Sequence, residues 1–297
     1  MSTVYLNGEL LPKERALVPV DDRGFLFADG IYEVSPAYRG SFFRLERHLD
    51  RMRRGLAALR IDYDPAPLVE MHRELLAANH LQDEPISIVY VQITRGVAPR
   101  AHAFPTGKVQ PTIYAYAKEF KRAPREVWEQ GYTATTVPDR RWARCDIKAI
   151  ALLPNCLAQQ AAVEAGTHDA VFVRDGIAIE GALNNFFAVI DGTVVTHPAT
   201  NHILHGITRE YVLELCQDLG LPVEERPIQL EELWTAEEAF FTGTTTEVRP
   251  TVKIDGRAIG GGKPGPVARK LMDAFVAGVE RETAAPRASH GGTPARV

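Results

Sequence analysis

Residues 140–154 read Arg-Arg-Trp-Ala-Arg-Cys-Asp-Ile-Lys-Ala-Ile-Ala-Leu-Leu-Pro, which places Lys148 between Ile147 and a run of apolar side chains. A lysine in such surroundings loses part of its hydration, and burial favours the neutral amine over the ammonium form. A neutral amine can form a Schiff base with a carbonyl compound. The alternative is that Lys148 extends from the end of a strand, with an apolar stem and a solvated ammonium group. Taken alone, residues 140–154 favour that alternative.

Downstream of Lys148 the sequence predicts two hairpins with Glu180 between them, followed by two features suited to binding an anion. Turns at 175–176 and 191–192 are Asp-Gly dipeptides typical of hairpins, and Glu180 ends a strand between them. Residues 205–209 open an amphipathic helix, and the N–H groups at a helix start form a general anion site. Three threonines follow Gly243, where their hydroxyls either face phosphate oxygens or simply end a strand.

Upstream of Lys148 the sequence predicts strands with two helices. Residues 21–34 mix glycine, acidic and aromatic residues without a period, which predicts a loop presenting Tyr32. Apolar residues at steps of four and three over 45–59 predict an amphipathic helix, and a second helix covers 68–76. Arg51 flanks the apolar stripe of the first helix, so it reaches either an anion or solvent.

A loop after the predicted strand at 86–94 contains a candidate carboxylate receptor. Arg100 and His102 are two residues apart, so both side chains point the same way if the segment is extended. A guanidinium fork and an imidazole N–H together suit a carboxylate. Two solvated polar residues on a loop are an equally good interpretation.

Composition narrows the class of protein. The chain has 297 residues, 45% hydrophobic and 24% charged, with a net charge of −4 and a pI of about 6.2. This balance predicts a soluble globular protein that binds neither nucleic acid nor an anionic membrane. Three widely spaced cysteines predict no disulfide framework and no metal site. A polar start and the absence of a long apolar run predict a cytoplasmic location.

The chain is long enough for two domains. We expect a small α+β domain over 1–120, a linker over 121–131 and a larger domain over 132–282. The tail at 283–297 is rich in Ala, Gly, Pro and Ser, which predicts disorder.

Read together, these features match the requirements of pyridoxal 5′-phosphate: an amine, a carboxylate for a pyridinium nitrogen, and phosphate sites. The order Glu-x-Ala-x-x-Asn-Phe-Phe from Glu180, then Leu-His-Gly-Ile-Thr-Arg from Leu204, resembles the signature of the class IV, fold-type IV aminotransferases. The stretches at 21–34, 94–105 and 141–148 are similar to members of that family that act on D-amino acids. The resemblance covers residues from about 4 to 270.

The resemblance implies a small N-terminal α/β domain and a larger C-terminal domain built around a β-barrel-like sheet, with the cofactor at their interface. Lys148 is then the Schiff-base lysine that also moves the substrate proton, and Glu180 pairs with the pyridine nitrogen. The implied phosphate and ring contacts come from Arg51, Leu204, Ile207, Thr208 and Thr244.

For the substrate, the resemblance implies that Tyr32, Arg100 and His102 bind the carboxylate, the last two from the neighbouring subunit of a homodimer. It also implies amino transfer from a D-alanine-like donor to a 2-oxoglutarate-like acceptor through alternating half-reactions. The alternatives are an L-branched-chain aminotransferase or an (R)-amine transaminase, and more remotely an aminodeoxychorismate lyase-like enzyme or a non-catalytic carrier of the cofactor.

The sequence departs from the family pattern at two places. Ala182, Leu183 and Asn184 stand where small or hydroxylic residues are usual, so Asn184 is expected to supply a lost hydroxyl contact near the cofactor. Gly243 replaces a residue that is often serine. Both departures imply a change in cofactor retention and pocket size rather than in the type of reaction.

Overall fold

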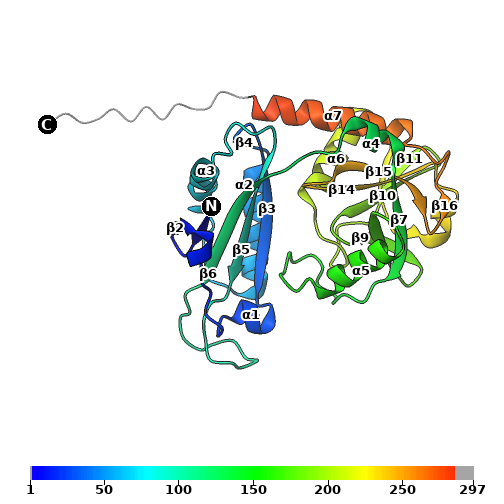
Figure 1. Ribbon diagram of the computed structural model, residues 1–297. Coiled ribbons are helices and arrows are strands. Elements are labelled where there is room, and N and C mark those ends of the chain that lie inside the picture. The colour runs from blue at the N-terminus through cyan, green and yellow to red at the C-terminus, as the bar shows by residue number, and fades with distance from the viewer. Residues whose placement is uncertain (1, 285–297) are drawn as a thin grey trace.

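The computed structural model describes residues 2–284, which form two lobes joined by one extended segment (Figure 1). The N-terminal lobe is a single antiparallel sheet in the order β2-β1-β6-β5-β3-β4. Its strands are β1 (Thr3–Leu6), β2 (Glu9–Pro12), β3 (Gly30–Tyr38), β4 (Ser41–Phe42), β5 (Ser87–Thr94) and β6 (Thr112–Glu119). Its helices are a 3-10 turn (Lys13–Arg15), α1 (Arg23–Phe27), α2 (Leu45–Leu59) and α3 (Leu68–Ala78).

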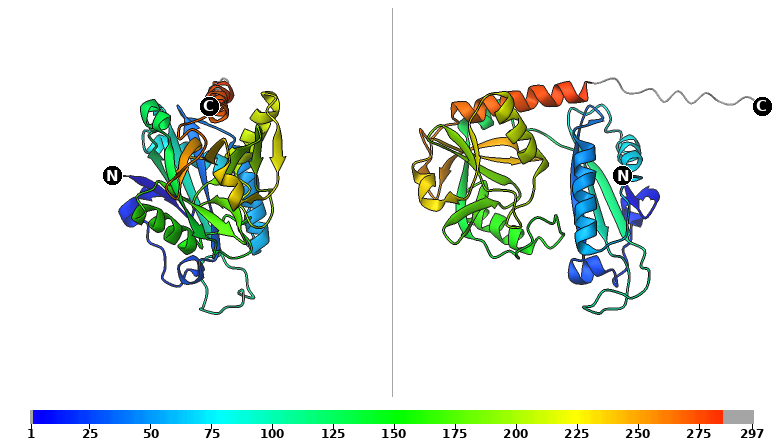
Figure 2. Two further views of the ribbon diagram at one scale, coloured as in Figure 1. Left: turned by 90° about the vertical axis from the view of Figure 1, so that its right-hand side faces the viewer. Right: turned by 180° about the vertical axis from the view of Figure 1, so that it is seen from behind.

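Helices α2 and α3 cover one face of this sheet, and α2 is seen along its length in the view from behind (Figure 2). The apolar period predicted α2 with its observed bounds, because every fourth or third side chain enters the core. Ile31, Ile93 and Ile113 lie side by side across β3, β5 and β6 and face these helices. At Gly55 the helix comes so close that a Cβ would lie 3.2 Å from Ile31 Cγ2.

The prediction of a loop over 21–34 is wrong. Asp22 caps α1 by accepting a 2.7 Å hydrogen bond from the N–H of Gly24, and Ala28 ends the helix in the left-handed region. The residues from Gly30 onward belong to β3, whose face toward α2 and α3 is buried but carries the polar residues Glu33 and Ser35 beside Ile31 and Ala37. The strand therefore shows no simple alternation of polar and apolar residues in the sequence.

The C-terminal lobe contains a closed six-stranded barrel. Its strands follow the cycle β10-β14-β15-β7-β8-β9, and the single pair Glu180↔Asn185 joins β9 to β10 and closes it. The barrel strands are β7 (Tyr132–Pro138), β8 (Asp169–Arg174), β9 (Ile177–Gly181), β10 (Asn185–Ile190), β14 (Glu238–Gly243) and β15 (Glu247–Ile254). The predicted hairpins at 175–176 and 191–192 join β8 to β9 and β10 to β11.

Shorter strands and helices complete this lobe. The strands are β11 (Thr193–Thr196), β12 (Val223–Glu225), β13 (Ile228–Gln229) and β16 (Arg257–Ala258), with a 3-10 helix at Leu230–Trp234. The helices are α5 (Leu153–Glu164), α6 (Ile207–Asp218) and α7 (Pro266–Thr283). Phe43 of the N-terminal lobe packs edge-on against Tyr211 of α6 and Phe275 of α7, which ties the two lobes together.

The segment expected to be a linker is partly helical. Residues 125–130 form α4 (Arg125–Gln130), whose Trp128 is buried in the core of the C-terminal lobe and donates a 2.8 Å hydrogen bond to Val248 O. The tail predicted to be disordered is 283–297; Thr283 is instead the last residue of α7, and residues 285–297 lie outside the described residues. Within residues 2–284, no helix is both long enough and apolar enough to cross a membrane.

Candidate active site

A cavity of about 520 Å³ lies between the lobes, where β3 of the N-terminal lobe faces the open end of the barrel. Predicted site residues from both lobes line it, namely Tyr32, Lys148, Glu180, Asn184 and Leu204. Residues from four separate segments therefore meet in one place.

The backbone of Lys148 is fixed by the free edge of β3. Tyr32 N donates to Lys148 O over 3.0 Å, Ala149 pairs with Ile31, and Ile150 N donates to Gly30 O over 3.1 Å. The side chain then extends into the cavity, with Nζ 4.1 Å from the centroid of the Tyr32 ring. Among residues 2–284 no carboxylate forms an ion pair with Lys148, so its amine is available for chemistry.

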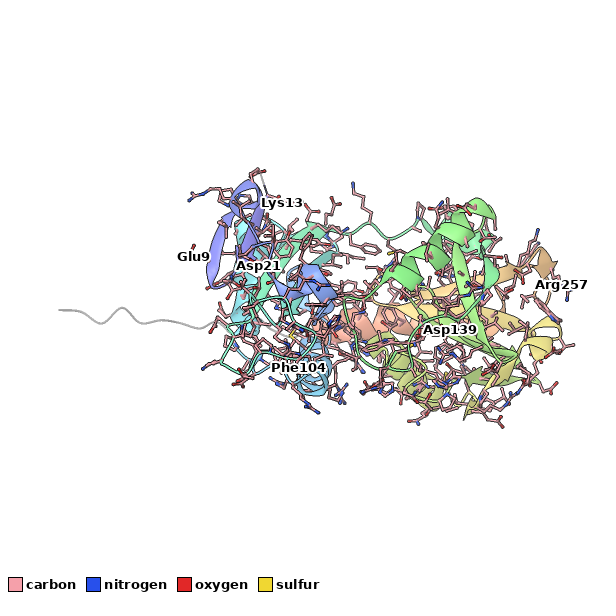
Figure 3. All side chains as sticks on the ribbon, turned by 90° about the horizontal axis from the view of Figure 1, so that it is seen from below. Glu9, Lys13, Asp21, Phe104, Asp139 and Arg257 are labelled. Atoms are coloured by element: carbon pink, nitrogen blue, oxygen red, sulfur yellow. The ribbon has the colours of Figure 1, made fainter. Side chains whose placement is uncertain are left out.

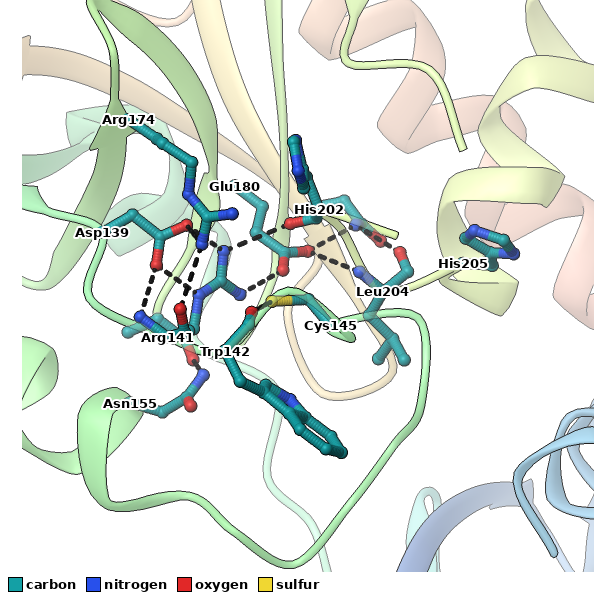
Figure 4. A network of polar contacts seen from close by, with 12 residues as sticks. Asp139, Arg141, Trp142, Cys145, Asn155, Arg174, Glu180, His202, Leu204 and His205 are labelled. Atoms are coloured by element: carbon teal, nitrogen blue, oxygen red, sulfur yellow. Dashed lines mark hydrogen bonds and ion pairs between the residues drawn. The ribbon is translucent and has the colours of Figure 1, made fainter. Parts of the chain in front are cut away.

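Glu180 is the penultimate residue of β9, at the point where the barrel closes, and its carboxylate is buried. It accepts hydrogen bonds from Leu204 N at 3.1 Å and Asn185 Nδ2 at 3.0 Å, and it forms an ion pair with Arg141 (Figure 4). Burial raises the pKa of Glu180, and the guanidinium of Arg141 opposes that rise. A cationic N–H donor from a ligand would stabilise the ionised carboxylate further.

Arg141 is a site residue that sequence reasoning missed. Asp139 holds its guanidinium through contacts of 2.9 Å to Nε and 3.0 Å to Nη2, and Arg174 contacts the same aspartate at 3.0 Å (Figure 4). The guanidinium also stacks over Phe172, with Cζ 4.1 Å from the ring centroid. Three arginines occur between 140 and 144, and nothing local distinguishes the one that reaches Glu180.

The start of α6 and Arg51 form a second part of the candidate site, which is suited to binding an anion. Gly206 precedes α6 without a capping side chain, so the N–H groups of Ile207 and Thr208 remain available to a ligand. Arg51 Nη1 donates to His205 O over 3.1 Å, which brings the guanidinium to this helix end. A Cβ at residue 206 would lie 2.0 Å from Asn185 Oδ1, which explains the glycine.

Arg51 is buried, and a carboxylate that sequence reasoning missed holds it there. Glu33 accepts from Arg51 Nε at 2.6 Å and from Nη2 at 2.9 Å. His48 Nδ1 lies 2.9 Å from Glu33 Oε2 and, because burial lowers the pKa of His48, the neutral ring donates to the carboxylate. Burial alone would raise the pKa of Glu33, but Arg51 and His48 lower it well below its usual range.

Thr244 and Asn184 differ in whether the protein itself satisfies their hydrogen bonds. Thr244 follows Gly243 at the end of β14, and its hydroxyl has no hydrogen-bond partner among residues 2–284. Asn184 uses both ends of its amide within the protein: Oδ1 accepts from Thr246 Oγ1, and Nδ2 donates to Asp169 over 2.6 Å. The Thr244 hydroxyl is therefore available to a ligand, whereas the Asn184 amide is already hydrogen-bonded within the protein.

Arg100 and His102 do not line the cavity. Both are exposed and lie against Phe27 of α1, with ring-centroid distances of 5.2 Å for the guanidinium and 5.6 Å for the imidazole. The two side chains therefore contact the same aromatic ring. Phe104, from the same loop, lies on the N-terminal lobe, while Asp139 lies in the other lobe (Figure 3).

The residues present fit pyridoxal 5′-phosphate. An amine and a buried carboxylate line one cavity, and an uncapped helix start with a buried guanidinium beside it suits a phosphate. These groups match the aldehyde, the pyridine nitrogen and the phosphate of that cofactor. Within residues 2–284, no side chain caps the start of α6 where the phosphate would bind.

Comparisons with known proteins identify the family of the chain. The family model for amino-transferase class IV matches residues 30–254. The D-alanine aminotransferase of Staphylococcus haemolyticus is 43% identical over 277 residues, 93% of this chain and 97% of that protein, and that of Bacillus licheniformis is 39% identical over 95% and 98%.

Solved structures show the same fold. A branched-chain amino acid aminotransferase from Escherichia coli superposes with a TM-score of 0.85 at 25% identity, covering 98% of this chain and 97% of that chain. The branched-chain aminotransferase of the archaeon Thermoproteus uzoniensis, solved with norvaline, gives 0.82 at 28% identity and covers 94% of each chain. The fold, the cavity and these matches agree, and the chain belongs to the class IV aminotransferases.

Proposed function

We propose that this class IV aminotransferase is a D-amino acid transaminase that passes the amino group of a D-alanine-like donor to a 2-oxoglutarate-like acceptor. The observation that carries the proposal is the 43% identity to a D-alanine aminotransferase over 93% of the chain, in a protein whose Lys148 and Glu180 share one cavity. The Arg-x-His pair at 100–102 supports the choice of D-amino acids over branched-chain L-amino acids.

Pyridoxal 5′-phosphate would supply an aldehyde that condenses with amines and a ring that takes up electrons from the substrate α-carbon. Lys148 Nζ would hold the cofactor, and as a free amine it would move the proton to and from the substrate α-carbon. Its apolar neighbours Ile147 and Ala149 are buried and limit the access of water to the amine.

Glu180 would keep a proton on the pyridine nitrogen. Three N–H groups, from Arg141, Leu204 and Asn185, already orient its carboxylate. A pyridinium partner adds the positive charge that offsets burial, so the carboxylate would stay ionised when the cofactor is bound.

In the second part of the site we propose that Arg51, the N–H groups of Ile207 and Thr208, and Thr244 hold the phosphate, and that Leu204 packs against the ring. Glu33 would serve to orient Arg51, because two of the three guanidinium nitrogens bind it. Asn184 would act through Thr246 rather than by direct contact.

For the substrate carboxylate we propose Tyr32 from one subunit with Arg100 and His102 from the other subunit of a homodimer. The N-terminal lobe exposes large apolar side chains near that loop: Leu17, Val20 and Phe25 are 79%, 71% and 75% exposed. Apolar groups of this size are typical of a surface covered by another chain. We keep the prediction that the enzyme acts in the cytoplasm.

The test is the substitution Arg100→Ala, with Lys108→Ala in the same loop as the control. We expect kcat/KM for D-alanine to fall at least about 100-fold, because a charge-assisted carboxylate contact is lost, while Lys108→Ala stays near wild type. An enzyme that turns over L-leucine faster than D-alanine, with D-alanine turnover unchanged in Arg100→Ala, would instead be a branched-chain aminotransferase.

A further inference from the structure

The turn between β14 and β15 is held from behind by one side chain of the β9–β10 connection. Asn184 Oδ1 accepts a hydrogen bond from Thr246 Oγ1, and Thr246 N donates to Gly243 O over 3.2 Å. Thr244 and Thr245 lie between these two anchors. No hydrogen bond joins either hydroxyl to another residue of the described chain.

Asn184 cannot easily change its orientation. It is 8% exposed, and its Nδ2 donates to Asp169 Oδ2 over 2.6 Å. Arg249 forms an ion pair with the same Asp169 oxygen, and Ala170 N donates to the other carboxylate oxygen over 2.8 Å. Rotating the amide would turn Oδ1 toward the Asp169 carboxylate, so that two oxygens without a proton between them would face each other.

Gly243 is required by this amide and not by its own backbone. Its φ lies outside the left-handed region, so another residue could adopt the conformation. A Cβ at position 243, however, would lie 2.7 Å from Asn184 Oδ1 and 3.4 Å from Thr246 Oγ1. The side chain at 184 occupies the space that a side chain at 243 would need.

We propose that Asn184 and Gly243 are a coupled pair, in which Asn184 is a positioning residue that fixes the 243–246 turn for the cofactor phosphate without touching it. The phosphate part rests on the proposed function. The amide at 184 supports Thr246 and occupies the space that a side chain at 243 would need.

The test is a double-mutant cycle of Asn184→Ser, Gly243→Ser and the combination, read as the dissociation constants of pyridoxal 5′-phosphate and of pyridoxal. We expect each single substitution to raise the first constant about 10-fold, as the loss of one buried hydrogen bond would. The combination should return within about 3-fold of wild type, because the hydroxyl introduced at position 243 then gains both the space and Thr246 as a partner. Pyridoxal affinity should change little in all three.

Gly261→Ser is the matched control, because a Cβ there meets no atom within 4 Å. The melting temperature of the cofactor-free variants serves as a second readout. The melting temperature of Gly243→Ser should lie below that of wild type, and that of the combination should return toward the wild-type value. Additive effects in the cycle, or equal losses for pyridoxal and its phosphate, would overturn the proposal. A wild-type protein that binds the cofactor but transfers no amino group would instead refute the proposed function and leave the cycle interpretable.

Discussion

At the scale of single residues, one buried histidine lies outside the cavity and is held neutral by its surroundings. His72 lies on the buried face of α3, where Nδ1–H donates to Leu68 O over 2.6 Å and Nε2 faces the Ser35 hydroxyl at 3.3 Å. Burial lowers the pKa of His72 to about 4, so the folded protein keeps this ring neutral through most of the acid range.

This histidine predicts an acid-sensitive stability. The unfolded chain protonates His72 near pH 6.5 and the folded chain only near 4, so the unfolded state binds more protons between these values. The free energy of unfolding therefore falls as the pH falls through this window, by about 3 kcal/mol in total. In His72→Gln the decline measured by urea unfolding from pH 7 to about 4.5 should be smaller, whereas exposed His80→Gln should match wild type. Equal declines in all three proteins would contradict the assignment.

Residues of the site differed in how far the sequence could identify them. Lys148 and Glu180 stand out because their neighbours and their order in the chain are distinctive. Glu33 and Arg141 do not, because each acquires its role from a partner 18 or 39 residues away. Such pairs exist only once the lobes have folded and brought those side chains together.

At the scale of elements, the turn after β14 is also held from the opposite lobe. Glu247 begins β15 in the left-handed region with φ 54° and is buried. Arg122 binds it through two contacts of 2.6 Å, and the Tyr38 hydroxyl donates to it over 3.2 Å. Burial and the neighbouring carboxylate raise the pKa of Tyr38, which keeps the phenol protonated as a donor.

Removing Arg122 should weaken this connection between the lobes. Arg122→Met leaves the Glu247 carboxylate buried with one weak donor, and we expect the free energy of unfolding to fall by about 2 kcal/mol, less than for a fully buried pair because Arg122 is 35% exposed. Arg125→Met, which removes two more exposed ion pairs, should cost less, below about 1 kcal/mol. Denaturant unfolding of both variants measures this, and a loss for Arg122→Met as small as for Arg125→Met would refute the role.

The elements themselves were predictable where a clear period exists. The helix at 45–59, the strand ending at Thr94 and the two Asp-Gly hairpins follow from local sequence. The helix at 23–27 and the strand after it do not, because a side-chain cap starts the helix and the buried face of the strand carries the polar residues Glu33 and Ser35. Tertiary contacts decide these elements.

At the scale of the whole molecule, residue patterns predicted strands but not their closure into a barrel. That closure depends on the pair Glu180↔Asn185, and only the family resemblance anticipated it. The division into domains at 121–131 stays a prediction, with α4 packed on the C-terminal lobe.

The shared active site gives a prediction at this scale. If Arg100 serves the neighbouring subunit, then Lys148→Ala and Arg100→Ala subunits, each of which has little or no activity as a homodimer, form a heterodimer with one intact site. Co-expressed with different tags, a random mixture should recover about a quarter of wild-type activity, and the isolated heterodimer about half. In the matching control, a heterodimer of wild type with a subunit that carries both substitutions should have no intact site and no activity. No recovery in the purified heterodimer would show that each site is built from a single subunit.

The most direct test of the central claim is the absorption spectrum of the purified enzyme loaded with pyridoxal 5′-phosphate and mixed separately with D-alanine and with L-leucine. We predict that D-alanine alone converts the band of the lysine-bound cofactor to that of pyridoxamine 5′-phosphate, and that 2-oxoglutarate restores it. Conversion by L-leucine and not by D-alanine would contradict the proposed substrate class and the role given to Arg100 and His102.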